Sequence, residues 1–119
     1  MNDFPLMYSK AADIEQRRLA RKPLFGLGRL VATPGALEVL TATQFHPIRL
    51  LQRHQCGDWC DANELCMADR QTNDQALISG GRLLSVYRVA GIRLYVITEA
   101  VNDATGQRDS TCILLPSEY

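Results

Sequence analysis

The sequence predicts an α+β fold in which two to three helices pack against one antiparallel sheet of three to four strands. The apolar spacing is helical up to about residue 78 and alternates with a period of two from about residue 82. Helices followed by consecutive strands favour a C-terminal β-meander covered by the helices. A chain of 119 residues, 46% of them hydrophobic, is enough for one core, so a single domain is expected.

Residues 1–25 are expected to be a basic-leaning N-terminal lead-in, followed by the α+β domain at residues 26–119. Within the lead-in, Ser9 can cap a short helix that Pro23 stops. The apolar residues of this stretch do not form a continuous stripe, so a helix here has little surface to bury.

A short strand is expected next, within Gly26–Thr33, because its apolar residues are bounded by glycines and a Thr-Pro pair. Thr33 followed by Pro34 is typical of a helix N-cap with proline at the first helical position, where the missing N–H costs nothing. The helix that starts there is expected to reach about Gln44. Pro47 then begins a second helix that ends near Gly57.

A longer helix is expected from about Ala62 to Ile78, capped by Asp58 or Asp61. A buried polar group costs about 1–3 kcal/mol if it lacks a partner, so the polar residues on its inner face should each find one. The residues expected on that face are Ala62, Leu65, Cys66, Asp69, Asn73, Ala76 and Leu77.

The strands form a meander. RLLSVYRV and IRLYVITEA are separated by Ala90-Gly91, which fits a two-residue hairpin turn with glycine in the second position. Residues 101–110 are polar and turn the chain again. TCILLP supplies a last strand that Pro116 stops.

The charge balance favours no class of charged partner. Thirteen basic residues balance thirteen acidic ones, so the net charge gives no argument for a nucleic-acid, membrane or acidic ligand, and no membrane partner is expected. The N-terminus has early acidic residues and no apolar run before a cleavage site, so we expect no signal peptide and a cytoplasmic location.

The cysteines do not match a metal-binding pattern. His54, Cys56, Cys60 and Cys66 lie close together, but they lack the paired two-residue knuckles typical of structural zinc sites. No nucleophile–base pair, phosphate loop or pair of carboxylates is recognisable. The sequence therefore predicts no catalytic residues, no metal and no cofactor, and a protein that is not an enzyme.

The strongest candidate for a binding surface is an acidic stretch between residues 56 and 74, which holds five acids and one base. Asp69 is expected to face inward, whereas Asp61, Glu64 and Asp74 are expected to be free to meet a basic partner. Trp59 is expected to pack over the sheet or, alternatively, to lie at the binding surface. The predicted partner-binding residues are Asp58, Asp61, Glu64, Asp74 and Trp59.

Several blocks of the chain resemble a family of small bacterial proteins carried on integrative elements and plasmids, often loosely labelled as related to type I restriction–modification. The resemblance spans residues 28–119. Its blocks are GRLVATPGAL, PIRLLQRH, Gly57-Asp58-Trp59, Asn73–Leu77, Gly80–Tyr87, Val96–Ala100 and Ile113–Tyr119. The chain departs from the family at Cys60, where glycine commonly stands, and in a longer loop at residues 101–109.

The resemblance implies a protein of mobile elements, and with the acidic stretch it favours an anti-CRISPR or anti-restriction protein that binds a Cas or restriction subunit. Its oligomeric state is left open between monomer and homodimer. The alternative is an accessory or regulatory protein of element maintenance that binds nucleic acid. The basic residues that would serve this alternative are Arg17, Arg18, Arg21, Lys22, Arg49 and Arg53.

Overall fold

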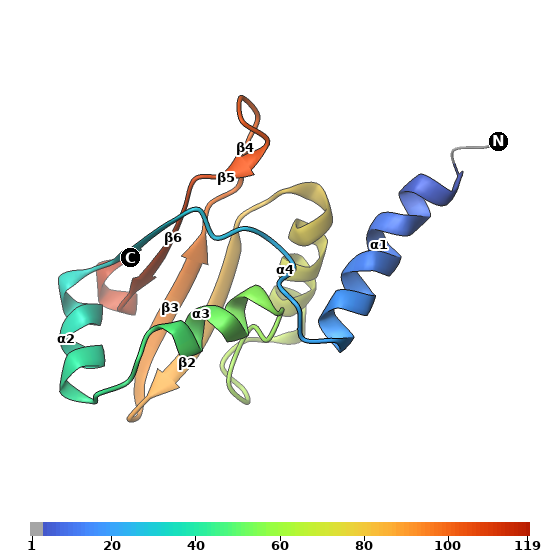
Figure 1. Cartoon of the computed structure of the whole chain (residues 1–119). Helices are drawn as coiled ribbons and strands as arrows, with labels where there is room; N and C mark the ends of the chain where they lie inside the picture. The colour runs from blue at the N-terminus through green and yellow to red at the C-terminus, as the bar shows by residue number, and fades with distance from the viewer. Residues whose placement is uncertain (1–3) are drawn as a thin grey trace.

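The computed structural model describes the backbone of residues 4–119 and the side chains of residues 10–119, and it confirms the α+β class. Figure 1 shows a central sheet with helices packed around it. The elements are α1 (Phe4–Leu19), β1 (Arg29–Ala32), α2 (Pro34–Ala42), α3 (Ile48–Gln55), α4 (Met67–Ser79), β2 (Leu83–Val89), β3 (Ile92–Thr98), β4 (Val101–Asn102), β5 (Gln107–Arg108), β6 (Ser110–Leu114) and the 3-10 turn η1 (Pro116–Glu118).

The sheet has the order β1-β6-β3-β2, with β4 and β5 forming a separate two-stranded ribbon. The predicted meander β2-β3-β6 is confirmed and antiparallel, whereas β1 pairs with β6 in parallel, so the complete sheet is mixed. A parallel pair requires a long crossover, which here includes all of α2, α3 and α4.

The hairpin between β2 and β3 has the predicted two-residue turn. Ala90 and Gly91 both adopt left-handed backbone conformations, with φ of 51° and 81°, as a type I′ turn requires. This turn sets the register, which places Tyr87 opposite Leu94 and Ser85 opposite Val96.

Two cores lie around the sheet. In the first, α2 and α3 cover one face, which we call the helix-covered face, with Leu40 and Leu50 against Tyr87, Leu94 and neighbouring strand residues. In Figure 1, α3 crosses this face of the sheet. The second core lies beside β2, where α4 and the segment at residues 59–65 enclose the following residues: Trp59, Leu65, Ala76, Leu77, Leu83 and Val86.

Helix α2 begins as the Thr33-Pro34 pair predicts. The backbone N–H of Ala36 donates to Thr33 Oγ1 at 3.3 Å, so the threonine caps the helix. The following helix, α3, also starts just after its proline, Pro47.

Helix α4 starts at Met67, five residues later than predicted. The preceding segment runs beside β2 instead of joining the helix. Cys60 forms a β-bridge with Val86, and the Asp61 N–H donates to the Val86 carbonyl at 3.2 Å. Pairing with a strand therefore replaces the first predicted turns of the helix.

Four of the residues predicted to face inward are buried: Leu65, Asn73, Ala76 and Leu77. Ala62, Cys66 and Asp69 are exposed, so their expected inward positions are wrong. Ala62 and Cys66 precede the helix, which begins at Met67.

The N-terminal helix α1 is longer than expected, and Ser9 lies inside it rather than at its start. Its second half docks on the second core through half-buried Ile14 and Arg18. Figure 1 shows its first half extending away from the body. No helix in the described part of the chain is long and apolar enough to cross a membrane.

Candidate partner-binding surface

The predicted acidic residues at positions 58 and 61 are both paired with one arginine of α3. Arg53 Nε lies 2.7 Å from Asp58 Oδ2, and Arg53 Nη1 lies 2.9 Å from Asp61 Oδ1. The same guanidinium stacks over the Tyr87 ring at 4.3 Å, and the Tyr87 hydroxyl donates to the Asp58 carbonyl. These contacts attach the segment after α3 to β2.

Glu64 bridges two arginines on neighbouring strands. Arg88 on β2 and Arg93 on β3 are cross-strand partners, and each donates from Nε to one carboxylate oxygen of Glu64, the latter at 2.8 Å. These hydrogen bonds hold the pKa of Glu64 below its usual range. Two like charges opposite each other on a sheet repel, so this glutamate supplies the compensating charge.

Asp74 and Trp59 belong to a third internal contact. Asp74 Oδ1 lies 2.5 Å from Arg18 Nη2 of α1 and accepts a hydrogen bond from Trp59 Nε1 at 2.9 Å. The Trp59 side chain is only 4% exposed, and Arg18 lies over its ring. The carboxylate thus joins α1, α4 and the second core.

The structure contradicts one premise of the predicted acidic surface, namely that its carboxylates are unpaired. Asp61, Glu64 and Asp74, expected to be free, have arginine partners within the chain. Trp59 is buried in the second core, which agrees with the first of its two predicted positions. Sequence reasoning missed these pairs because the partners come from α1, α3, β2 and β3.

The opposite face of the sheet from α2 and α3 offers a different candidate. It carries Tyr95 and Ile97 of β3 beside Cys112 of β6. Helix α4 packs against β2, so over β3 the cover comes from η1 and the residue that follows it, Tyr119. We call this region, made of Arg82, Tyr95, Ile97, Cys112 and Tyr119, the tyrosine face.

Tyr119 is the centre of the tyrosine face. Its ring meets the Tyr95 ring edge-on with centroids 6.0 Å apart, and its hydroxyl accepts a hydrogen bond from Arg82 at 2.9 Å. The side chain is nevertheless 67% exposed. Arg82 is also 3.5 Å from Glu99, which holds the guanidinium beside the ring.

Two hollows adjoin at Tyr119. One, of about 210 Å³, lies toward α4 and includes Leu65, Asn73 and Leu84; the other, of about 320 Å³, lies toward β6 and includes Cys112 and Leu114. Arg82, Ile97 and Tyr119 line both hollows. The tyrosine side chain thus separates two small, partly apolar depressions.

The C-terminal segment is held in place from the other side by Glu118. Its carboxylate accepts hydrogen bonds from Thr33 Oγ1 at 2.5 Å, from the Leu115 N–H at 2.9 Å and from the Gly35 N–H at 3.1 Å. The Thr33 bond, followed by the backbone N–H groups, lowers the pKa of Glu118. A carboxylate at the N-terminus of α2 is favourable because the helix dipole is positive there.

A buried polar network lies under α3 on the helix-covered face. His54 Nδ1 hydrogen-bonds with Ser85 Oγ at 2.5 Å, and its Nε2 hydrogen-bonds with Thr98 Oγ1 at 2.8 Å. Thr98 continues to Thr111 at 2.6 Å, which donates to the Leu27 carbonyl at 2.7 Å. The network joins α3, β2, β3, β6 and the segment before β1.

This histidine is placed for structure rather than for proton transfer at neutral pH. Burial, assisted by the charge of Arg108, lowers the pKa of His54 to about 3, so the ring is neutral. His54, Ser85, Thr98 and Thr111 are all fully buried, and no substrate can reach them without opening the core. All of their side-chain polar atoms have partners.

The last candidates from the sequence are the four cysteines and a possible metal site. Cys56, Cys60, Cys66 and Cys112 are free thiols. In the portion of the chain that the structure describes, no three His, Cys, Asp or Glu side chains converge as a metal site needs.

The comparisons with known proteins add no relative. No family model, no curated protein and no solved structure matches this chain.

Proposed function

We propose that this chain is a non-catalytic binding protein that acts through the tyrosine face. The observation that carries the proposal is the exposed Tyr119 ring between two adjoining hollows, with Arg82 and Tyr95 in contact with it. Tyrosine and arginine are the residue types enriched where binding energy concentrates at protein interfaces.

The side chains of the tyrosine face are also held in position before a partner binds. Glu118 anchors the segment to α2, and Arg82 and Tyr95 restrict the Tyr119 side chain. Less conformational entropy is therefore lost when a partner closes over it. The hollows can receive apolar side chains, and Glu99 near Arg82 gives the rim both signs of charge.

The partner proposed from the family resemblance is a Cas or restriction subunit, which the protein would inhibit by occupying a surface. Such inhibition requires no nucleophile. It also does not require the acidic stretch at residues 56–74, so this proposal keeps the predicted function and assigns it to a different surface.

The alternative, nucleic-acid binding in element maintenance, has less support. Three of its six basic residues are engaged in ion pairs: Arg17 with Asp13, Arg18 with Asp74, and Arg53 with two aspartates. An ion-paired arginine must lose its carboxylate partner before it can neutralise a phosphate.

The experiment measures protection of a phage or plasmid in hosts with CRISPR interference or restriction. We expect the parent to protect, and the double variant Tyr119→Ala with Arg82→Glu to lose most of that protection. Arg49→Glu is the matched control, because Arg49 is an exposed arginine of α3 on the helix-covered face. Circular dichroism confirms that each variant is folded.

The outcomes separate the surface from the function. Equal protection by the folded double variant and the parent would show that the tyrosine face is not the contact surface. Failure of the parent against every defence system tested would contradict the inhibitor function itself. Salt-sensitive binding of the parent to DNA or RNA would favour the maintenance alternative.

A further inference from the structure

The β1 edge of the sheet has free backbone hydrogen-bonding groups. The N–H of Arg29 donates to the Asp109 carbonyl at 2.9 Å, and that of Thr33 donates to the Ile113 carbonyl at 3.0 Å. The backbone N–H and C=O groups of the odd-numbered β1 residues therefore point toward β6. Those of Leu30 and Ala32 point away from the sheet. Within residues 4–119, β1 pairs with no strand other than β6.

The side chains beside this edge are apolar and exposed. Leu30 is 53% exposed and Val31 is 39% exposed, and Leu37, one turn into α2, is 50% exposed. Natural edges are commonly protected by proline, a bulge or inward-pointing charges. β1 reads Arg-Leu-Val-Ala, and its single charge lies at its first residue.

The start of β1 is fixed in position by a close backbone approach. A Cβ atom on Gly28 would lie 2.4 Å from the Arg108 carbonyl oxygen and 2.6 Å from that of Asp109, so only glycine fits there. The β1 edge is therefore already an ordered strand. Little conformational entropy of β1 is lost when a second strand pairs with it.

We propose that β1 pairs with β1 of a second copy of this chain, antiparallel about a two-fold axis at Val31. This continues the sheet across the two copies into eight strands, four from each. In this register Leu30 of one copy forms a hydrogen-bonded pair with Ala32 of the other, and all outward backbone groups of both strands are used.

Neighbouring symmetric registers fit less well. An axis at Ala32 would place Leu30 opposite Pro34, which has no N–H to donate. An axis at Leu30 would bring in Gly28, whose φ of 64° departs from strand geometry. Val31 at the axis is also the arrangement that pairs a large side chain, Leu30, with a small one, Ala32.

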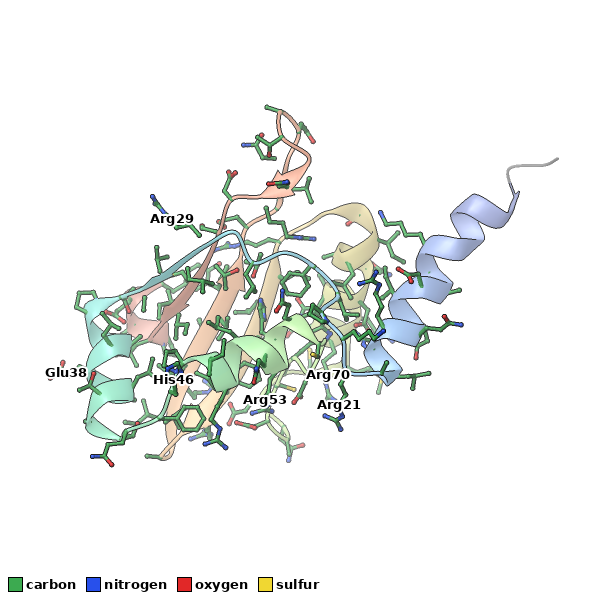
Figure 2. The ribbon with its side chains drawn as sticks, viewed as in Figure 1. Arg21, Arg29, Glu38, His46, Arg53 and Arg70 are labelled. Atoms are coloured by element: carbon green, nitrogen blue, oxygen red, sulfur yellow. The ribbon has the colours of Figure 1, made fainter. Side chains whose placement is uncertain are left out.

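Charge complementarity favours a second copy over other extended segments. In this register Arg29 lies opposite Thr33 of the other copy, with Cβ atoms about 5 Å apart. Thr33 is hydrogen-bonded to Glu118, so the guanidinium of one copy meets the Glu118 carboxylate of the other. Arg29 extends away from the body in Figure 2 and has no ion-pair partner among the described residues. Two-fold symmetry makes this contact twice.

The test is the mass of the full chain in solution as a function of concentration, by sedimentation or light scattering. A seam of this length is small for an interface, so the dissociation constant should be on the order of micromolar. The parent should approach twice the 13.3 kDa mass of one chain. A mass of one chain at concentrations of about 1 mM would overturn the proposal.

Charge variants at the axis test the register. Val31→Lys and Val31→Glu each place like charges opposite each other, so each alone should raise the dissociation constant about tenfold or more. Mixed in equal amounts, the two variants should form a heterodimer. Ile92→Lys is the matched control, since Ile92 has a similar exposure of 42% but lies at the hairpin end of β3. No recovery on mixing would overturn the two-fold axis at Val31.

A proline variant tests the backbone bonds separately from side-chain charge. Leu30→Pro removes an N–H that points outward and leaves the bonds to β6 in place, so the monomer should remain folded by circular dichroism while the dimer is lost. A folded Leu30→Pro protein that dimerises as strongly as the parent would contradict strand pairing at this edge.

Discussion

The two edges of the sheet differ in how the chain treats their backbone groups. Along β2, the Asn73 amide donates to the Leu84 carbonyl at 2.7 Å and its oxygen accepts the Leu84 N–H at 3.1 Å. The Val86 N–H donates to the Trp59 carbonyl at 2.9 Å, and the Val86 carbonyl accepts from Asp61. Along β1, Leu30 and Ala32 face outward with exposed apolar neighbours.

The comparison explains what two blocks of the sequence do in the fold. The Gly57-Asp58-Trp59 block and the Asn73–Leu77 block are used to close the β2 edge and to fill the second core. Trp59, which the sequence marks as a candidate binding residue, therefore has a structural role at the β2 edge. The chain contains no equivalent cover for β1 within the described residues, which is why that edge supports the proposed self-association.

The largest loss of stability is expected from Trp59→Ala, at the β2 edge. Removing this buried ring leaves a cavity beneath the segment that covers β2, which should lower the free energy of unfolding by about 3–5 kcal/mol. Urea denaturation monitored by circular dichroism measures the change. Trp59→Phe is the control, since it keeps most of the volume but loses the bond to Asp74. An unchanged stability of the alanine variant would contradict the assigned burial.

Lowering the pH should reduce the free energy of unfolding, because His54 is buried beneath α3 in its neutral form. The folded-state pKa of His54 is about 3, below its ordinary value of 6.5, so the unfolded chain binds the proton first. The stability that the neutral ring provides is complete above pH 6.5 and falls by about 1.4 kcal/mol per pH unit as the pH drops toward 3.

The window between pH 6.5 and 5 isolates this histidine from the carboxylates, which titrate lower. Urea denaturation across that window should show the slope in the parent and in His46→Asn, because His46 is exposed. His54→Gln should remove the slope. A parent whose stability is flat across the window would show that His54 titrates normally.

The smallest expected change in the free energy of unfolding comes from comparing one substitution at the β2 edge with one at the β1 edge. Asn73→Ala leaves the outward groups of Leu84 without their partner and should cost about 1–3 kcal/mol. Leu30→Ser, measured at a dilution where the chain is monomeric, should change stability by about 0.5 kcal/mol or less. Amide hydrogen exchange at Leu84 should become faster only in the first variant. Equal costs at the two edges would remove the distinction between them.

The sequence by itself determined the local structure. Period-two alternation with Ala90-Gly91 predicted the β2–β3 hairpin, Thr33-Pro34 predicted the start of α2, and the requirement for a partner predicted that Asn73 would be hydrogen-bonded. These signals depend on residues that are neighbours in the chain, so their physical causes, side-chain alternation, capping and turn geometry, can be read from a short window.

Only the tertiary structure decided the pairing of distant groups. Arg18 and Asp74 are 56 residues apart, Arg88 and Glu64 are 24 apart, and β1 reaches β6 across most of the chain. A local pattern does not specify which arginine meets which carboxylate, because many combinations satisfy the same composition. The packing of α1 and of the segment before α4 selected these pairs. It gave the predicted acidic residues arginine partners and left Tyr119 and the β1 edge exposed.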